Sequence, residues 1–245
     1  MTQKLTPVAV ITGSSRGLGA VLASLLAGQG FDLVITARGR DDLDAVRTRL
    51  AGYGRRIITI PGDISDPVHQ ADVIAAAESL GGLDILINNA SDLGATPLPR
   101  QADYPLDALR RAVEINVIAP IALTQRALPM LRARHGLIVN ISSDAAQGGY
   151  PGWGGYGATK AALDLLTITL ANEEPDVAAV SVDPGDMRTV MHQAAFPGED
   201  ISDRPLPDVT LPFWAWLLGQ DRAAVSGGRY HAQSENWQPM RGVVS

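Results

Sequence analysis

A tyrosine and a lysine that could exchange a proton stand four positions apart in the sequence. Tyr156 and Lys160 open a long stretch of helical period, and residues at i and i+4 share one face of a helix. A free tyrosine has a pKa of about 10, and a neighbouring ammonium group lowers it by stabilising the phenolate. Such a pair can act as an acid in one direction and as a base in the other. A tyrosine and a lysine that merely lie on the surface of a helix can have the same spacing. The surrounding motifs must therefore decide between a catalytic pair and a surface pair.

A serine hydroxyl supports the chemical interpretation. The apolar run before this helix ends in Ser142 and Ser143, and Ser143 lies 13 residues before Tyr156, across the glycine-rich loop 147–155. Its hydroxyl could hydrogen-bond the carbonyl oxygen of a substrate. The alternative is that Ser142 or Ser143 satisfies backbone groups of the turn, as serines at loop starts often do.

A glycine-rich turn near the N-terminus favours a bound dinucleotide. The first apolar run is followed by TGSSRGLG at 12–19, which contains Gly13, Gly17 and Gly19, and then by a helical pattern. Glycines let the backbone turn tightly and approach a pyrophosphate, and the start of a helix offers unpaired N–H groups to an anion. The spacing is GxxxGxG and not GxGxxG, so an ordinary turn between strand and helix is the alternative.

Two arginines favour NADP(H) over NAD(H). An NAD site usually has an acid at the end of the second strand for the ribose 2′-hydroxyl, whereas an NADP site offers an arginine to the 2′-phosphate. Here the second apolar run ends in Arg38 without an acid, and Arg16 of the glycine turn could bind the same phosphate. The alternative for Arg38 is a solvated side chain before the acid-rich segment 41–44.

The elements that must position these residues alternate between short apolar runs and helical segments, which is typical of an α/β fold with a parallel sheet. We expect strands near 8–12, 32–36, 56–60, 84–88, 137–141 and 178–182. We expect helices near 17–29, 40–51, 67–79, 105–134 and 156–172, with the helix at 105–134 broken at Pro120 or Pro129. A helix near 209–218 and a strand near 229–232 complete a Rossmann-type, doubly wound sheet of about seven strands with helices on both faces. Ligands bind such sheets at the carboxyl ends of the strands, near which all these motifs fall.

The segment 183–212 is expected to be a loop that acts as a lid. It is rich in Pro, Gly and Asp and has no clear periodicity. Loops of this length without secondary structure are usually functional or disordered. Closure would exclude water from the reaction site, and Met191 or Phe196 could then contact the substrate. A rigid loop packed against a neighbouring subunit is the alternative.

Composition and residue spacing limit the number of domains, the partners, the location and the metal sites that we expect. A chain of 245 residues with 46% hydrophobic content can form one domain over residues 1–245. Its net charge of −6 comes from dispersed charges without a long basic run, so we expect no nucleic-acid or membrane partner. The chain has no cysteine, no signal-peptide layout and no membrane-length apolar stretch, which favours a cytoplasmic location. The histidines lack metal-ligand spacing, so we expect no metal site and interpret each as a surface or loop residue, namely His69, His135, His192 and His231.

Together these segments resemble the classical short-chain dehydrogenase/reductase family over nearly the whole chain. Further motifs that carry the resemblance are GDI at 62–64, NNA at 88–90 and PGxxxT at 184–189. The resemblance implies a catalytic set of Asn116, Ser143, Tyr156 and Lys160. It implies a cofactor site made of Gly13, Ser15, Arg16, Gly17, Leu18, Gly19, Arg38, Asp63, Ile64, Asn89, Ala90, Tyr156, Lys160, Pro184, Gly185 and Thr189.

The resemblance also implies a role for each catalytic residue. Tyr156 gives its proton to a carbonyl oxygen as hydride arrives from the nicotinamide, and Ser143 holds that oxygen. Lys160 binds the nicotinamide ribose, and Asn116 steadies a water that relays protons through Lys160. An asparagine at a kink in a buried helix is the alternative for Asn116. We expect a homodimer or homotetramer.

Three departures from the family pattern bear on the substrate. Ser91 stands where the family usually has glycine, Asp144 adds a charge beside Ser143, and the segment 226–232 replaces the Val-Asp-Gly-Gly ending of acyl-carrier reductases. The last of these puts an acyl-carrier substrate in doubt. Apolar pocket candidates, which could also be simple core, are Met187, Met191, Phe196, Trp214 and Trp216.

The expected function is NADP(H)-dependent hydride transfer to the carbonyl group of a small molecule, with ketone reduction as the direction. The first alternative is an NAD(P)-dependent alcohol or sugar dehydrogenase. The second is a regulatory protein that senses NADP without catalysis. The intact catalytic set argues against a sensor, which has no chemical need for it.

Overall fold

The computed structural model describes residues 5–238, which divide into two compact units. Within this range, the first unit comprises residues 5–90 and 119–138, and the second comprises residues 91–118 and 139–238. The strands form a seven-stranded sheet in the order β3-β2-β1-β4-β5-β6-β7. The chain adds β2 and β3 on one side of β1 and then returns to add β4 to β7 on the other side. This reversal of the strand order confirms the predicted doubly wound sheet. The single domain over residues 1–245 stays a prediction.

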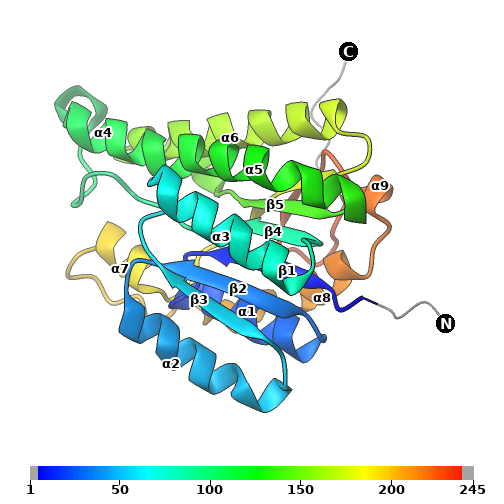
Figure 1. Ribbon diagram of the computed structural model, residues 1–245. Helices are drawn as coiled ribbons and strands as arrows, with labels where there is room; N and C mark the ends of the chain where they lie inside the picture. The colour runs from blue at the N-terminus through cyan, green and yellow to red at the C-terminus, as the bar shows by residue number, and fades with distance from the viewer. Residues whose placement is uncertain (1–4, 239–245) are drawn as a thin grey trace. The chain divides into compact units, whose positions relative to one another are not determined.

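The first unit has helices on both faces of four parallel strands. Its strands are β1 (Val8–Thr12), β2 (Asp32–Ala37), β3 (Ile57–Pro61) and β4 (Ile85–Asn88). Its helices are α1 (Gly17–Gly28), α2 (Arg40–Leu50), α3 (Pro67–Leu80) and α5 (Ala119–Arg134). Figure 1 shows α1 and α2 on one face of these strands and α3 and α5 on the other. All five residues of β1 are buried, as expected for a strand covered on both faces.

The ends of α3 illustrate how local sequence defines a helix in this unit. Asp66 accepts the backbone N–H of Val68 as the N-cap, and Pro67 stands at the first helical position, where its missing N–H costs nothing. Gly81 ends the helix with a φ of 110°, a conformation that favours glycine. A single-turn 3₁₀ helix at Ala51–Tyr53 follows α2.

The predicted helix at 105–134 is interrupted, although not at a proline. It forms α4 (Leu106–Val113), a π-helical turn at Glu114–Ile118 and then α5. The turn lies just before Pro120, which has no N–H to donate to the carbonyl of Asn116 four residues earlier. Pro129, in contrast, lies inside α5.

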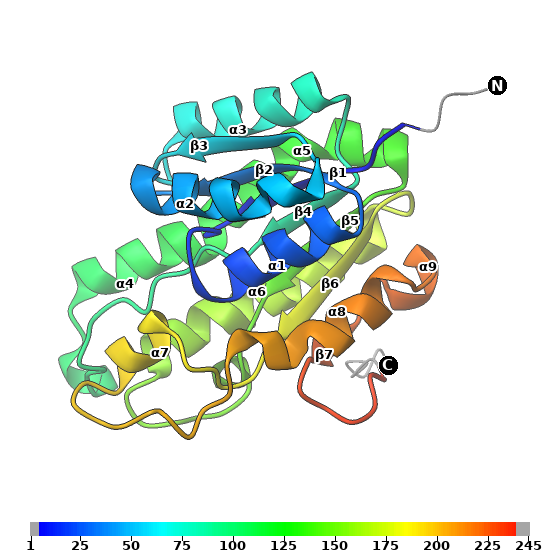
Figure 2. The same ribbon diagram turned by 90° about the horizontal axis from the view of Figure 1, so that it is seen from below.

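The second unit contains the remaining strands, β5 (Leu137–Ile141), β6 (Ala178–Asp183) and β7 (Arg229–His231), of which β5 begins in the first unit. Its other helices are α6 (Gly154–Glu173), α7 (Val190–Ala195), α8 (Leu211–Leu218) and α9 (Arg222–Val225). Three short 3₁₀ turns lie at Gln101–Asp103, Asp144–Ala146 and Pro207–Thr210. Figure 2 shows α8 and α9 beside β6 and β7, and the Phe213 ring of α8 lies 5.9 Å from that of Tyr230 in β7.

The segment 183–212 contains more structure than predicted. Thr189 accepts the backbone N–H of His192 as the N-cap of α7, and a 3₁₀ turn at Pro207–Thr210 leads into α8. The expectation of a loop without secondary structure was therefore wrong. A six-residue helix is too short to produce a readable helical period. Closure of this segment as a lid stays a prediction.

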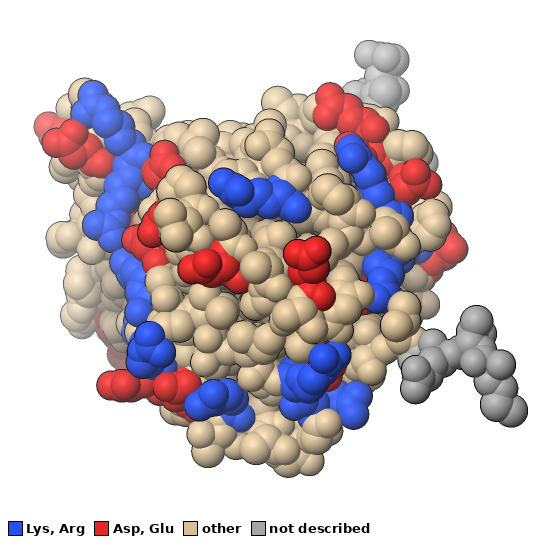
Figure 3. Space-filling view, viewed as in Figure 1, with Lys and Arg blue, Asp and Glu red and all other residues tan. Residues whose placement is uncertain are grey.

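Two structural features are absent from residues 5–238. No helix in this range is long and apolar enough to cross a membrane. No group of three or more potential metal-ligating side chains occurs in the same range. Figure 3 shows basic and acidic side chains interspersed on the face seen in Figure 1.

Candidate active site

The glycine turn of the first unit is packed too tightly for side chains. Gly13 has a φ of 66°, and a Cβ atom there would lie 2.8 Å from the Cα atom of Ala90. A Cβ atom on Gly19 would lie 2.4 Å from the carbonyl oxygen of Gly13. Both distances are shorter than van der Waals contact, so the turn requires glycine at these positions.

The NNA motif holds this turn in place. The Asn89 side chain donates to the carbonyl oxygens of Thr12, at 2.8 Å, and Gly13, at 3.0 Å. The Thr12 hydroxyl accepts the backbone N–H groups of Asn89 and Ala90, each at 2.9 Å. Asn89 and Ala90 therefore shape the loop that the resemblance links to the cofactor.

The start of α1 has the features of an anion-binding helix end. Arg16 is the N-cap residue, and its side chain makes no capping hydrogen bond. The first N–H groups of a helix have no intrahelical partner, and the helix dipole favours negative charge there. This geometry suits the pyrophosphate of a dinucleotide, so Ser15, Gly17 and Leu18 stay cofactor-binding candidates.

The two arginines predicted to bind a 2′-phosphate lie on the surface of the first unit. The side chains of Arg16 and Arg38 are exposed, and neither has a hydrogen-bond or ion-pair partner within residues 5–238. Arg38 directly follows β2, which ends at Ala37 without an acid. Asp63 is half-buried and accepts the backbone N–H and the hydroxyl of Ser65, at 3.0 and 2.7 Å. Its neighbour Ile64 is also half-buried.

One residue near this end of the sheet was misread from the sequence. His69 was interpreted as a surface or loop histidine, but it is buried and its Nε2 atom lies 2.7 Å from the hydroxyl of Thr36 at the end of β2. A Cβ atom on Gly62 would lie 2.3 Å from its Nδ1 atom. Burial lowers the pKa of His69. The signal available in the sequence was Gly62, which leaves room for the ring.

In the second unit, α6 carries the predicted proton-transfer pair. Tyr156 is 8% exposed and Lys160 is 1% exposed. The Lys160 Nζ atom lies 5.5 Å from the centre of the Tyr156 ring and donates to the carbonyl oxygen of Ile141 at 2.7 Å. Helix α6 approaches the turn after β5 closely, because a Cβ atom on Gly157 would lie 2.3 Å from the carbonyl oxygen of Ala145.

Burial dominates the acid–base properties of this pair. It raises the pKa of Tyr156, and hydrogen bonding to the hydroxyls of Ser91 and Ser143 opposes the rise. It lowers the pKa of Lys160 to about 8, and the charge of Asp164 opposes the fall. Burial therefore sets the direction of the pKa shift of Tyr156, against the lowering expected from a neighbouring ammonium.

Ser143 has the local role considered from the sequence, and its substrate-binding role stays a prediction. Its hydroxyl accepts the backbone N–H of Ala145 at 3.2 Å, as the N-cap of the 3₁₀ turn, and donates to the Asp144 carboxylate at 3.0 Å. It also interacts with the Tyr156 hydroxyl. The backbone contact fixes the serine beside the tyrosine, so the local role supports the chemical one.

Asn116 is completely buried in the π-helical turn and uses its whole amide group. Its Nδ2 atom donates to the carbonyl oxygen of Asp92 at 2.8 Å and to the hydroxyl of Thr159 at 2.9 Å. Its Oδ1 atom accepts the Asp92 N–H at 2.7 Å and the Ser91 hydroxyl at 3.1 Å. Asn116 therefore fastens the segment after β4 to α6 between Tyr156 and Lys160.

The PGxxxT motif follows β6. Gly185 has a φ of 74°, and its N–H donates to the Asp183 carboxylate at 2.9 Å. The Gln233 side chain donates to the carbonyl oxygens of Pro184, at 3.0 Å, and Asp186, at 2.9 Å. These bonds hold the turn, while Thr189 caps α7.

The apolar pocket candidates separate into two clusters. Met191 and Phe196 pack against a cluster that includes Tyr156, Leu93 and Ala145. Other partly buried side chains packed there are Leu98 and Trp153. Trp214 and Trp216 lie elsewhere, stacked with the aromatic rings of Phe213, Tyr230 and Trp237. Met187 is buried.

The burial of Lys160 predicts a pH-dependent stability. Its pKa is about 8 when folded and 10.5 ordinarily, so between these values the unfolded chain binds more protons and the folded state gains stability as pH rises. We expect the free energy of unfolding of the wild type, relative to Lys160→Met, to rise by about 2 kcal/mol from pH 7 to pH 9.5. Urea unfolding of both proteins at each pH measures this difference. A difference independent of pH would contradict the lowered pKa.

Comparison with known proteins identifies the family. The family model for the short chain dehydrogenases matches residues 7–200. The L-xylulose reductase of Aspergillus niger is 36% identical over 242 residues, which cover 89% of this chain and 75% of that protein. A short chain dehydrogenase of Salmonella enterica has a TM-score of 0.86 at 26% identity, with 96% of this chain and 100% of that one covered. The alcohol dehydrogenase of the archaeon Thermococcus sibiricus, complexed with 5-hydroxy-NADP, has a TM-score of 0.82 at 28% identity, with 92% and 95% covered. The chain belongs to the short chain dehydrogenase family.

Proposed function

We propose that this protein is an NADP(H)-dependent oxidoreductase that reduces the ketone group of a small molecule to an alcohol. The observation that carries the proposal is the buried group around Tyr156, in which Ser143 contacts the tyrosine and Lys160 lies one helical turn away. Burial raises the pKa of Tyr156, so the phenol is protonated near neutral pH. A protonated phenol is the form that can donate its proton to a carbonyl oxygen, as the proposed reduction requires.

The residues of the first unit fit a dinucleotide. The glycine turn has room for no Cβ atom at Gly13 or Gly19, and the start of α1 has unpartnered N–H groups. When bound, NADPH supplies the hydride. We propose that the remaining contacts to it come from Asp63, Ile64, Asn89, Ala90, Tyr156, Lys160, Pro184, Gly185 and Thr189.

The protein's own residues would then manage the substrate oxygen and its proton. Ser143 would donate a hydrogen bond to the carbonyl oxygen, which requires its hydroxyl to turn away from Asp144. Tyr156 would transfer its proton to the same oxygen. Lys160, buried and with a lowered pKa, would return a proton to the tyrosine. Asn116 would hold the segment after β4 against α6 during these steps.

The surroundings of Tyr156 support an apolar group next to the reacting carbonyl. The Trp153 ring lies 5.8 Å from the Tyr156 ring, edge to face, and the Phe196 ring lies 5.9 Å from Trp153. These side chains offer few partners for the hydroxyl groups of a sugar, each of which loses free energy when buried unpaired. The L-xylulose reductase relative favours the second candidate, a keto sugar, and this candidate predicts a different best substrate.

A substrate screen tests the proposed function. NADPH oxidation is followed with aryl and alkyl ketones, β-ketoesters, quinones and keto sugars, with Tyr156→Phe as the inactive control. We expect turnover of aryl ketones by the wild type alone. If the best substrate is a keto sugar, it replaces the proposed substrate with an apolar group next to the carbonyl. If no carbonyl compound is turned over, the proposal that the protein is a ketone reductase is refuted.

The cofactor assignment predicts a change in preference when Arg38 is replaced. We expect the wild type to bind NADPH more tightly than NADH, because two guanidinium groups without other partners are available to the 2′-phosphate. Arg38→Asp should reduce the ratio of affinities by about 10-fold or more, since each lost charged contact costs roughly 1.5–3 kcal/mol. Titration calorimetry measures both affinities. Arg40→Asp, which changes a nearby exposed arginine of α2, is the matched control, and equal affinities of the wild type for both cofactors would contradict the assignment.

A further inference from the structure

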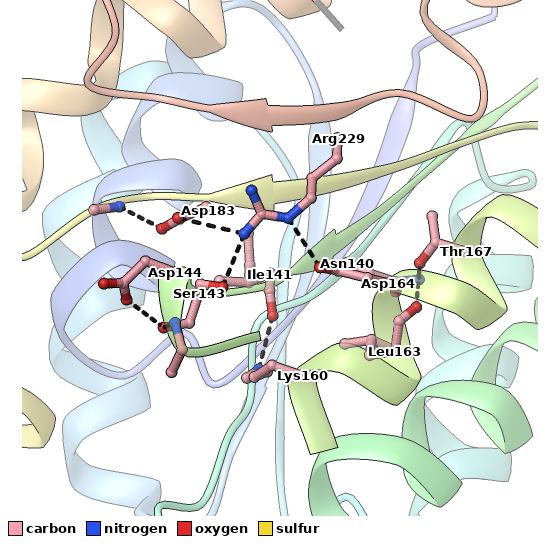
Figure 4. Close-up of polar contacts among 12 residues, drawn as sticks. Asn140, Ile141, Ser143, Asp144, Lys160, Leu163, Asp164, Thr167, Asp183 and Arg229 are labelled. Carbon is pink, nitrogen blue, oxygen red and sulfur yellow. Dashed lines mark hydrogen bonds and ion pairs between the residues drawn. The ribbon is translucent and has the colours of Figure 1, made fainter. Parts of the chain in front are cut away.

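A buried arginine at the start of β7 joins three segments of the second unit. The Arg229 side chain is 7% exposed. Its Nε atom donates to the Asp164 carboxylate at 2.9 Å, and its Nη2 atom donates to the carbonyl oxygen of Ser143 at 2.8 Å. The same Nη2 atom lies 3.5 Å from the Asp183 carboxylate. Figure 4 shows the guanidinium group between these acceptors, with Lys160 nearby on α6.

Each acceptor adjoins a residue of the proposed site. Ser143 offers its own backbone carbonyl, so Arg229 holds the residue that would hold the substrate oxygen. Asp164 follows Lys160 by one turn of α6 and therefore shares its face. Asp183 ends β6 and binds the N–H of Gly185 in the PGxxxT motif. The planar guanidinium group of Arg229 thus fixes the positions of Ser143, helix α6 and the turn at Gly185 relative to one another.

We propose that Arg229 is a positioning residue of the active site, which aligns Ser143 with α6 and compensates the charges of Asp164 and Asp183. The proposal rests on the proposed reductase function for its catalytic consequence, although the arrangement of charges can be measured without turnover. No motif of the family resemblance includes this position, which lies in the segment that departs from the family's usual ending.

The proposed compensation of charge follows from the burial of the Asp164 and Asp183 carboxylates. Asp164 has no hydrogen-bond donor other than Arg229 within the described residues, and its Oδ1 atom is buried without a partner. The charge of Asp164 raises the pKa of Lys160, and the charge of Asp183 raises the pKa of Tyr156. Asp144 and His231 also face Asp183, with opposite effects on its pKa. Without Arg229, the negative charges would act on the proton-transfer pair uncompensated.

The first experiment measures Lys160 directly, without substrate or cofactor. The sequence contains two lysines, Lys4 and Lys160, so the NMR signals of labelled lysine side chains are assigned by one Lys160→Met spectrum. We expect the pKa of Lys160 to rise in Arg229→Met and to return toward the wild-type value in Arg229→Met/Asp164→Asn. If the pKa of Lys160 is unchanged in Arg229→Met, Arg229 does not compensate the charges of Asp164 and Asp183, and this part of the proposal is refuted.

The second experiment uses kcat and its pH profile to separate the effect of the charge of Arg229 from the effect of its planar contacts. With the ketone that the substrate screen identifies, we expect Arg229→Met to lower kcat by about 10- to 100-fold, as misplacement of reacting groups does, with little change in the KM for NADPH. The alkaline limb of its pH profile should move upward. Arg229→Lys keeps the charge but not the planar contacts, so it should restore the pH profile and only part of kcat.

Arg56→Met is the matched control. Arg56 likewise joins a buried aspartate, Asp32 at 2.6 Å, to a carbonyl oxygen, that of Leu80 at 2.8 Å, and it touches no proposed catalytic residue. We expect Arg56→Met to lower the melting temperature without changing kcat or the pH profile. If Arg229→Met does not fold, the single variant Asp164→Asn must lower the pKa of Lys160. Equal losses in Arg229→Met and Arg56→Met, with no shift in pH profile or Lys160 titration, would reduce Arg229 to a structural role.

Discussion

Tyr156→Phe should lower kcat for ketone reduction by at least about 100-fold, the low end of what a positioned general acid contributes. The substitution removes the phenolic hydroxyl and keeps the ring, whose edge contact with Trp153 has a centroid distance of 5.8 Å. Packing around the site should therefore be preserved, and NADPH affinity should change little. Steady-state kinetics and titration calorimetry on the same preparation measure the two quantities.

Tyr230→Phe is the matched control for this substitution. Tyr230 is also buried, and its hydroxyl donates to the carbonyl oxygen of Val225 at 3.2 Å, among the aromatic side chains of α8. We expect this variant to lose stability and to keep kcat within a factor of about two, since the hydroxyl that it removes belongs to no residue of the proposed chemistry. Near-normal turnover by Tyr156→Phe would refute the role given to Tyr156.

The central part of the sheet could be predicted because β1, β4, β5 and β6 are buried along their whole length. Such strands appear in the sequence as continuous apolar runs, and those at 8–12 and 137–141 coincide with β1 and β5. The glycines of the cofactor turn could be read for a related reason. The left-handed φ of 66° at Gly13 and the clash of a Cβ atom on Gly19 with the carbonyl oxygen of Gly13 are both local requirements of this turn.

The features missed in the sequence depend on partners that are distant along the chain. Arg229 contacts Ser143 and Asp164, which lie 86 and 65 residues earlier, and nothing in the local segment indicates these acceptors. His69 of α3 is buried, and its ring contacts the hydroxyl of Thr36 in β2, which lies 33 residues earlier. Trp214 and Met191 likewise belong to two different clusters, whose members come from segments distant in the sequence. Local patterns carry no such information, so His69 was interpreted as a surface or loop histidine, and Met191 and Trp214 were considered together as pocket or core residues.

The π-helical turn illustrates a feature that was partly readable. Prolines at 120 and 129 indicated a break, and the structure has its irregular turn at Glu114–Ile118, before the first of them. The turn brings Asn116 inward, where all four hydrogen-bonding positions of its amide are used. Asn116 therefore occupies the position considered as the alternative, an asparagine at a kink in a buried helix, and its catalytic role stays a prediction.

Asn116→Leu should lower the free energy of unfolding by at least about 3 kcal/mol, because each buried group left without a partner costs about 1–3 kcal/mol. Leucine has the same branched arrangement of side-chain heavy atoms but cannot bond the backbone of Asp92 or the hydroxyls of Ser91 and Thr159. The segment after β4 would lose its attachment to α6, and kcat should fall by about 10-fold or more. Urea unfolding and steady-state kinetics measure the two effects.

Two threonines of α6 separate the loss of activity from the loss of stability. Thr159 and Thr167 are each 1% exposed, and each donates to a carbonyl of the preceding turn and accepts one asparagine amide. Thr159 accepts Asn116 at 2.9 Å beside the proton-transfer pair, whereas Thr167 accepts Asn140 at 2.8 Å two turns further along the helix. Thr159→Val and Thr167→Val should therefore destabilise the protein by similar amounts, about 1–3 kcal/mol, while only Thr159→Val lowers kcat. Equal kcat values in the two variants would show that Asn116 stabilises the fold without positioning the active site.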